Sequence, residues 1–243
     1  MIRSILFCIG IIVIYSCNDN TGADSQVPPK VQMVMRSPDT AAVEQGIDAV
    51  PESNGIQVQW HKLYHPALAY YYLYRKADDE LYFQRIKVID PERITQGGDT
   101  TYVDNDTTLS IFKWYQYFVT AANKEGDEGL ASDTVTYMLV EKAILISPDQ
   151  VVVSGDYVFR WSFIGTKPQY FILRIEEDFS QKLLFSNIFE INNFISGIDT
   201  LNLSETEPKL HFPEGRYRWR IDCIGESAES SGSESEWSRF FIE

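Results

Sequence analysis

Two histidines are the first residues to test for chemistry. His61 and His65 lie four positions apart, a spacing that on a helix would place both imidazoles on one face, where they could hold a metal ion. Here the pair follows a strand-like pattern and precedes Pro66, so the two side chains do not share a helical face. No acidic residue stands close to them in the sequence. The pattern therefore favours a loop over a metal site.

The acidic groups give equally weak signals. Asp104, Asn105 and Asp106 place oxygen ligands at a spacing of two, but a calcium loop needs several more ligands and a terminal bidentate acid. Turn chemistry explains the same residues. The acids at 176–178 are adjacent, and adjacent residues of a strand face opposite sides, which makes them a poor acid–base pair.

Motifs of common catalytic machinery are absent from the sequence. It contains no nucleophile elbow of the Gly-x-Ser-x-Gly type, no His-Glu-x-x-His and no phosphate-binding Gly-x-x-x-x-Gly-Lys loop. We therefore expect a protein that is not an enzyme, with no catalytic residues, no metal and no cofactor.

Composition narrows the class of protein further. A chain of 243 residues with 44% apolar and 14% aromatic residues has core material for one large or two ordinary domains. Its formal net charge of −14 argues against nucleic-acid binding, which needs basic surface to neutralise phosphates. With three cysteines, and only Cys223 beyond the N-terminal region, no disulfide framework is expected to hold the folded part together.

The segment 109–126 has the clearest strand pattern. Alternate side chains point one way at Tyr115, Tyr117, Val119 and Ala121. Leu109 precedes the run and a turn-like Asn-Lys-Glu-Gly closes it. This stretch resembles strand F of a fibronectin type III domain, in which a leucine leads into a tyrosine corner. We expect Tyr115 to be the structural tyrosine of that corner.

The same pattern returns near the C-terminus. Leu210 leads into Pro-Glu-Gly at 213–215 and then into Tyr217, Trp219 and Ile221. The resemblance implies an all-β fold: two tandem immunoglobulin-like (fibronectin type III) β-sandwiches, at residues 28–140 and 141–243. By the same resemblance, Trp60 and Trp161 occupy the core-tryptophan positions of the two units.

The junction and one later stretch complete this expectation. Glu141 and Lys142 form a short junction without a flexible linker, so the pair of sandwiches should behave as a semi-rigid rod. In the second unit, a strand is expected at 182–185, whereas the pattern from 186 to 197 is weak.

A tyrosine-rich strand at 70–75 offers a candidate binding face. By the family's Tyr-x-Val-Tyr-Arg pattern, Tyr71 and Leu73 are expected in the core, which places Tyr70, Tyr72 and Tyr74 on the other face. Tyrosines give a rigid surface with polar tips, suited to a protein or glycan ligand. The alternative is a packing ladder half-covered by Lys and Arg stems from neighbouring strands.

The last strands contain a second candidate. Arg216, Arg218 and Arg220 share one face, and Ser-Glu-Trp-Ser follows at 235–238. This resembles one half of the WSXWS element of some fibronectin-type domains, in which a tryptophan stacks between arginines. We expect Trp237 to stack on Arg218 or Arg220; the alternative is that it caps the core.

Between these elements lies the acidic, serine-rich stretch 225–236, expected to be a mobile loop. Glu229 and Glu234 are its candidate binding residues. The alternative is that this loop is solvated and contributes only to solubility. The thiol of Cys223, which precedes the loop, is expected to be inert because no cationic helix end stands near it.

The N-terminal sequence has the pattern of a targeting signal. One arginine precedes an apolar run from Ile5 to Tyr15 that is about half the ~20 residues needed to span a membrane, so a signal peptide at 1–16 is favoured. Its end, Ile-Tyr-Ser-Cys at 14–17, resembles the bacterial lipobox, which implies cleavage before Cys17 and lipidation of that cysteine. Residues 17–27 then form a lipidated tether reaching at most ~35 Å.

The combined expectation is a non-catalytic lipoprotein held at the bacterial outer membrane or cell surface through the lipid on Cys17. It would act as a binding or spacer module of the cell envelope, with a protein or glycan ligand and no nucleic acid. The alternatives are a structural subunit of an envelope assembly or an accessory carbohydrate-binding protein.

Overall fold

The computed structural model describes residues 26–93, 95–96, 99–154, 157–166, 168–189, 197–203, 211–225 and 231–243, with the side chains of 95, 96, 198 and 199 left aside. The signal peptide, Cys17, most of the tether, Leu210 and Glu229 lie outside the described residues. Within those ranges the secondary structure is almost wholly β, and no helix there is long and apolar enough to cross a membrane.

The first sandwich has two sheets. One has the order β1-β2-β6-β5, and the other has the order β8-β7-β3-β4. The strands are β1 (Asp48–Ala49), β2 (Ile56–His61), β3 (Tyr70–Ala77), β4 (Gln84–Ile89), β5 (Thr95–Gln96), β6 (Asp99–Asp104), β7 (Trp114–Ala122) and β8 (Val135–Leu139). Alternating burial along β2 and β7 places Val58, Trp60 and Tyr117 in the core between the sheets.

The second sandwich repeats this plan. One sheet has the order β14-β11-β9, and in the other β15 pairs with β12, β16 and β17, while β13 pairs with β12 and β10 pairs with β17. The strands are β9 (Ile144–Ser147), β10 (Val151–Val152), β11 (Val158–Phe163), β12 (Tyr170–Glu177), β13 (Leu183–Phe189), β14 (Gly197–Asn202), β15 (Gly215–Ile224), β16 (Ser231–Glu234) and β17 (Ser238–Ile242). Its core is a separate cluster that contains Trp161 and Trp219.

Both tyrosine corners are present. The hydroxyl of Tyr115 accepts a hydrogen bond from the Ser110 N–H at 2.8 Å, and the hydroxyl of Tyr217 donates to the Pro213 carbonyl. Both rings are buried. These bonds fasten the chain entering β7 and β15 to the strand itself, as the resemblance to fibronectin type III domains predicts. The predicted fold class, two immunoglobulin-like β-sandwiches of the fibronectin type III kind, is confirmed by this strand order.

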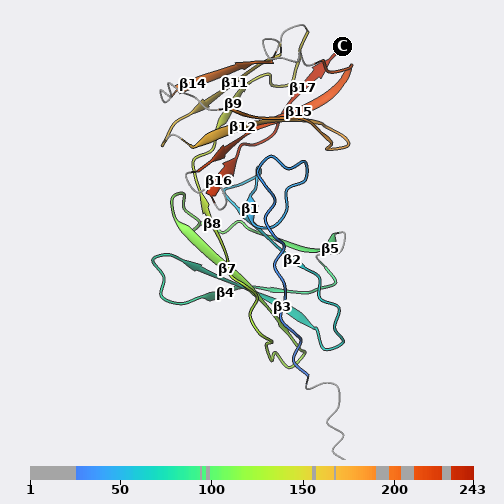
Figure 1. The fold of residues 1–243 in the computed structure, drawn as a ribbon, viewed down its shortest axis with the longest axis vertical. Coiled ribbons are helices and arrows are strands. Elements are labelled where there is room, and N and C mark those ends of the chain that lie inside the picture. The colour runs from blue at the N-terminus through green and yellow to red at the C-terminus, as the bar shows by residue number, and fades with distance from the viewer. Residues whose placement is uncertain are drawn as a thin grey trace, which may run out of the picture.

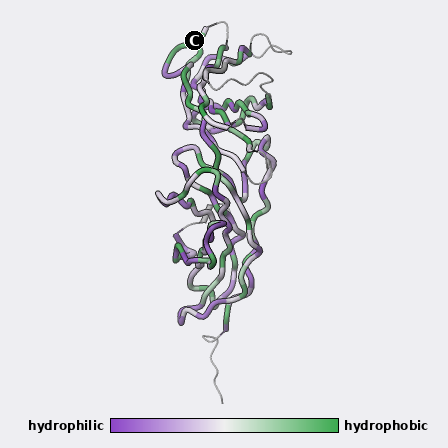
Figure 2. Tube along the Cα trace, turned by 90° about the vertical axis from the view of Figure 1, so that its left-hand side faces the viewer, coloured by the Kyte–Doolittle hydropathy of each residue, from purple (hydrophilic) through white to green (hydrophobic). Residues whose placement is uncertain are grey.

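The two sandwiches share a sheet. Strand β16 of the second sandwich pairs in parallel with β8 of the first, with Ser231 opposite Met138 and Gly232 opposite Leu139. The sheet therefore runs on from β4 in the first sandwich to β15 and β12 in the second (Figure 1). Figure 2 shows the two units stacked end to end along the long axis. The junction is thus built from paired strands as well as from the short connection at 141–142.

Candidate functional site

The tyrosine face of β3 is mostly covered. Tyr71 and Leu73 are fully buried as predicted, and Tyr70 is 38% exposed. The prediction of an exposed ladder is wrong for Tyr72, which is only 7% exposed. The Arg85 guanidinium lies 4.4 Å from the centre of its ring and Tyr70 stacks beside it.

Tyr74 is also held in place. Its ring stacks on Phe118 with 4.7 Å between centroids, and its hydroxyl donates to Glu128 Oε1 at 2.7 Å. Together with the cover over Tyr72, these contacts match the packing-ladder interpretation of the sequence. Tyr70 alone of the three keeps the exposure of a binding residue.

The histidines and the Asp104–Asp106 turn take part in separate local contacts. His61 Nδ1 lies 2.8 Å from Asp99 Oδ1 on the neighbouring strand β6, whereas His65 Nδ1 accepts from the Ala67 N–H. Asp106 Oδ1 accepts from the Thr108 N–H at 2.9 Å, the bond of a turn. These groups therefore make strand and turn contacts in the described structure.

The acidic stretch before Trp237 forms a strand. Residues 231–234 build β16, and Glu234 is 5% exposed. The prediction of a mobile loop with Glu234 as a free binding residue is therefore wrong for this part, because β16 is enclosed between β15 and β8. Glu229 lies outside the described residues.

Glu234 belongs to a buried group of charges at the junction, centred on Arg220 of β15. The Arg220 guanidinium lies 2.6 Å from Glu44 Oε2, 2.7 Å from Asp222 Oδ1 and 2.7 Å from Glu234 Oε1. Arg220 and Glu234 come from the second sandwich, whereas Glu44 comes from the segment that precedes β1 in the first. The network therefore joins the two sandwiches through charge-assisted contacts.

Arg174 of β12 repeats this connection. Its guanidinium pairs with Asp222 Oδ2 at 3.0 Å and Glu44 Oε1 at 2.9 Å, and it donates to the carbonyls of Asp39 and Ala41. The loop 38–44 of the first sandwich thus lies on the outer face of the second sandwich's sheet. The loop contacts Arg174 and Arg220 of this face, and both side chains are buried.

A third arginine binds the loop from the side of the first sandwich. Arg36 pairs with Asp39 and Asp48, and Tyr137 donates to Asp48 Oδ1 at 2.8 Å. Lys142 then donates to the carbonyls of Val50 and Ser53. Together with the Arg220 and Arg174 contacts, these bonds define the junction network used below: Arg36, Asp39, Glu44, Asp48, Arg174, Arg220, Asp222 and Glu234.

Burial sets the protonation of these acids. It raises the pKa of Asp222 to about 6, against the opposing effect of Arg220. The pKa values of Glu234 and Asp48 are raised for the same reason. Five carboxylates face three arginines in this network, so protonation of an acid relieves an excess of buried negative charge.

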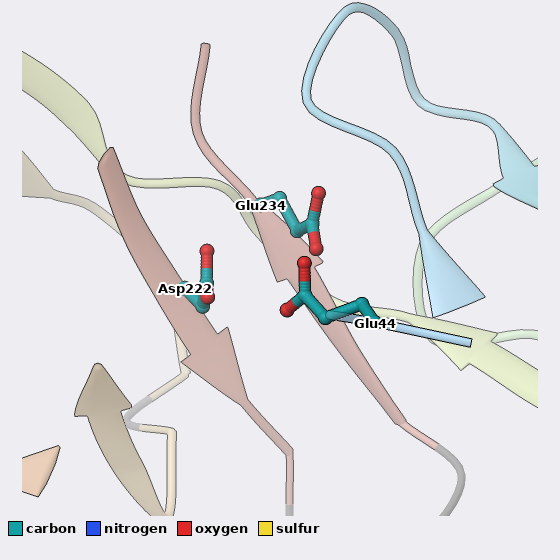
Figure 3. Close-up of side chains that lie close together, drawn as sticks. All are labelled: Glu44, Asp222 and Glu234. Carbon is teal, nitrogen blue, oxygen red and sulfur yellow. The ribbon is translucent and has the colours of Figure 1, made fainter. Parts of the chain in front are cut away.

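Three of these acids have the arrangement of a cation site. One carboxylate oxygen from each of Glu44, Asp222 and Glu234 lies within 4.8 Å of the others (Figure 3). The space enclosed beside them is only about 10 Å³, roughly one water molecule. Arg174 and Arg220 already supply positive charge to all three acids. The arrangement is thus that of an ion-pair network, with the guanidinium groups in the place of a metal.

Trp237 stacks as predicted. The guanidinium of Arg218 lies 4.1 Å from its ring centre and that of Arg220 lies 4.7 Å from it. Arg218 also pairs with Glu176. The predicted cation–π stack is confirmed with both arginines, and it connects Trp237 to the junction network through Arg220.

The thiol of Cys223 is fully buried. Burial raises its pKa to about 12, which leaves it un-ionised and unreactive at neutral pH, in agreement with the expected inert thiol.

Sequence reasoning missed a cavity beside the junction. It has a volume of about 510 Å³ and is lined by Met35, Arg36, Ser37, Pro38, Asp39, Thr40, Tyr170 and Ile188. Met35 is 86% exposed at its rim. Because both sandwiches contribute to it, only the tertiary structure brings these residues together. The cavity is a candidate binding site among the described residues.

Comparison with known proteins gives fold-level likeness only. No protein-family model and no curated protein sequence matches the chain. Among solved structures, a β-1,2-glucanase from Parabacteroides distasonis is similar at 24% identity over 44% of this chain and 14% of its own, with a TM-score of 0.31. The FN1–FN3 domains of chicken CNTN1 align over 88% of this chain and 66% of theirs, at 11% identity and a TM-score of 0.27. The fn3 domain of human contactin 1 covers 51% of this chain and 92% of its own, at 16% identity and a TM-score of 0.30.

Proposed function

We propose that this protein is a non-catalytic, lipid-anchored module of the bacterial cell envelope that holds its second sandwich at a fixed distance and orientation for binding. The observation that carries the proposal is the joint between the sandwiches, in which β8 pairs with β16 and the junction network crosses the same boundary. A joint with both features resists bending, which a freely hinged pair of domains would not.

The direction of the chain supports a spacer. The described chain begins at the free end of the first sandwich, and the C-terminus lies at the far end of the second (Figure 1). A lipid on Cys17 would therefore place the first sandwich next to the membrane and the second sandwich away from it. The cavity at the junction would then lie at a fixed distance from the membrane, where a partner can reach it.

Rigidity is tested by a distance distribution. Spin labels placed by Leu81→Cys and Phe179→Cys, at two highly exposed positions in different sandwiches, are measured by double electron–electron resonance. We expect one narrow distribution, because the junction fixes both labels in one frame. A broad distribution would overturn the spacer function even if the protein proved to be lipidated.

Anchoring and location need a separate test. Cells expressing the full chain are grown with an alkyne-bearing fatty acid. We expect the wild type and the Cys223→Ser control to carry the label and Cys17→Ser to lose it; an unlabelled wild type contradicts the anchor. A membrane-impermeant maleimide then reports the side of the envelope through Leu81→Cys, since labelling of intact cells indicates the cell surface, and labelling only after the outer membrane is opened indicates the periplasm.

The second candidate is a structural subunit of an envelope assembly. The exposed Met35 at the rim of the junction cavity favours it, because an apolar side chain at a preformed cavity suits a protein partner. A carbohydrate-binding function has less support, since Tyr170 is the one aromatic residue among those that line this cavity. Purification of the wild-type chain and of Met35→Glu from cells separates the spacer function from the subunit function. A stable partner that copurifies with the wild type and is lost from Met35→Glu favours the subunit, and no such partner favours the spacer.

A further inference from the structure

The loop 38–44 has a closed neck. The Ser37 N–H donates to the Gln45 carbonyl at 3.1 Å, and the Gln45 N–H donates to Ser37 Oγ at 3.0 Å. On both sides of this neck the chain pairs with β2, through the bridge between Met33 and Trp60 and through β1. The loop is therefore an excursion from the first sheet, and it can move about its neck without breaking the pairing of that sheet.

Polar contacts hold this loop against the second sandwich. Glu44 pairs with Arg174 of β12 and with Arg220 of β15. Arg174 also donates to two backbone carbonyls of the loop. Val43 of the loop is 69% exposed, so it adds little apolar contact. The attachment of the loop therefore depends mainly on charge, and a change of charge can release it.

An apolar strip lies under the loop. Ile172 stands between Tyr170 and Arg174 on β12 and pairs with Ile188 of β13. Alternation along β12 directs Tyr170, Ile172 and Arg174 to one face. Tyr170 and Arg174 both bond to the loop, and Ile172 between them is 0% exposed, which indicates that the loop covers it. Release of the loop would uncover Tyr170 and Ile172 beside Ile188, which lines the junction cavity.

The charge that holds the loop can be titrated. Glu44, Asp222 and Glu234 bring carboxylate oxygens within 4.8 Å of one another around a space of about 10 Å³ (Figure 3). Three like charges this close and this poorly hydrated favour the uptake of a proton. The other charged and titratable groups that face them come from the elements packed around them: Arg174 on β12, Arg220 on β15, Tyr137 on β8, Lys142 at the junction, and Asp39 and Asp48, which pair with Arg36.

We propose that the loop 38–44 is a pH-controlled cover, which closes over the strip at Tyr170, Ile172 and Ile188 when the acid cluster binds a proton and opens more often as the pH rises. Without the proton, the Glu44 carboxylate faces two further negative charges, and opening carries its own charge into water. Protonation removes one of these charges and leaves both arginines to hold the loop.

The protonation of the cluster supports this direction. Burial raises the pKa of Asp222 to about 6 and also raises the pKa of Glu234. In the open form water reaches both acids, so the closed form binds their protons more tightly. The resulting stabilisation of the closed loop is full below about pH 4 and is lost, for Asp222, as the pH rises through about 6. Titration of Asp222 alone thus changes the open population about tenfold between pH 5 and pH 8.

The reaction of a covered thiol measures how often the loop opens. In the full chain with Ile172→Cys, the new thiol lies under the closed loop and reacts with a maleimide when the loop opens. Its rate is divided at each pH by the rate of Val43→Cys, an exposed position in the same loop, which corrects for ionisation of the thiol. We expect this ratio to be about tenfold higher at pH 8 than at pH 5. A constant ratio overturns the proposal.

Two controls separate opening of the loop from other changes. Cys223 is buried in the core of the same sandwich, and peptide mass spectrometry distinguishes its label from that of Ile172→Cys. An equal rise in labelling of Cys223 overturns the proposal, because the whole sandwich then opens. Glu234→Gln imitates the protonated acid and should reduce the rise between pH 5 and pH 8, whereas Glu236→Gln, at an exposed acid nearby, should leave it unchanged. Equal rises in these two variants also overturn the proposal.

The wild-type chain gives a second measurement that no substitution disturbs. A protease that cleaves after glutamate reaches the bond after Glu44 when the loop is open, because the Glu44 side chain is held by two arginines in the closed form. Cleavage after Glu125, an exposed residue of the first sandwich, corrects for the protease's own dependence on pH. The ratio of the two cleavage rates should rise about tenfold from pH 5 to pH 8, and a ratio that stays constant or falls contradicts the cover.

Discussion

Replacement of Arg220 by methionine is the most informative perturbation of the junction network. The Arg220 guanidinium lies within 2.7 Å of carboxylate oxygens from Glu44, Asp222 and Glu234. It is 4% exposed, so water does not screen these contacts. Methionine keeps most of the aliphatic volume and removes the charge, leaving three acids of which Glu44 and Asp222 keep Arg174 as a partner.

The expected cost follows from the charges that remain buried. Removal of one partner from a buried ion pair typically costs about 3–5 kcal/mol, because the other charge stays desolvated and unpaired. The loss of the Arg220 stack on Trp237 adds about 0.5–2 kcal/mol. The acids can reduce this cost by taking up protons. We therefore expect a loss of about 3.5–7 kcal/mol in the free energy of unfolding at pH 8, and a loss smaller by about 1–2 kcal/mol at pH 5, where the acids take up protons more readily.

Denaturant unfolding followed by circular dichroism at both pH values measures this difference. Arg239→Met is the matched control, because Arg239 pairs with Asp178 on the surface and is 47% exposed, where an ion pair contributes about 0–1 kcal/mol. A loss below about 1 kcal/mol for Arg220→Met at both pH values would refute the argument that the buried charges depend on this arginine. So would a loss that grows as the pH falls.

Three further predictions concern single groups. Burial raises the pKa of Asp222 to about 6, above its ordinary 3.8, so the folded protein binds this proton more tightly than the unfolded chain. The resulting stabilisation is full below about pH 4 and is lost as the pH rises through about 6. The denaturant concentration at the unfolding midpoint should therefore decrease between pH 5 and pH 7, and Asp222→Asn should reduce this dependence on pH. An unchanged dependence in the variant would show that another group titrates. Trp237→Leu should lower the melting temperature by a few degrees, from the loss of about 0.5–2 kcal/mol of cation–π stacking on Arg218 and Arg220; a melt equal to wild type contradicts the stack. Cys223 should resist a thiol reagent in the folded protein and react in denaturant, because burial raises its pKa to about 12; rapid labelling of the native protein would show that the core opens.

The residues that sequence reasoning placed correctly depend on local patterns. Alternation along 115–121 and the tyrosine corners of Tyr115 and Tyr217 fix strands and core faces within a few residues, so no knowledge of distant partners is needed. The stack of Trp237 was predicted from the resemblance of 235–238 to half of a WSXWS element, and the arginines at 216, 218 and 220 that this resemblance requires share one face of a single strand.

The misassigned residues depend on partners far away in the sequence. Tyr72 is covered by Arg85, whose position requires the register between β3 and β4. The acidic stretch at 231–234 has the composition of a solvated loop, and its burial is stabilised by Arg220 across the β15–β16 ladder and by pairing with β8 of the other sandwich. A signal was present in the sequence, because three arginines on one strand face require negative partners if that face is buried. The parallel contact with β8 has no such local signal.

The junction network contributes to orientation more than to the strength of the joint. If the sandwiches separated, water would solvate Arg174, Arg220 and Glu44, so the attraction lost would be largely balanced by the desolvation regained. Strand pairing between β8 and β16 is short and tolerates some twist. The ion pairs fix the relative orientation of the sandwiches, because the Arg174 and Arg220 guanidinium groups must both meet the Glu44 carboxylate while Arg174 also donates to the carbonyls of Asp39 and Ala41. An Arg220→Met chain should therefore keep its two sandwiches in contact yet show a broader distribution of spin-label distances, which distinguishes loss of orientation from loss of the joint itself.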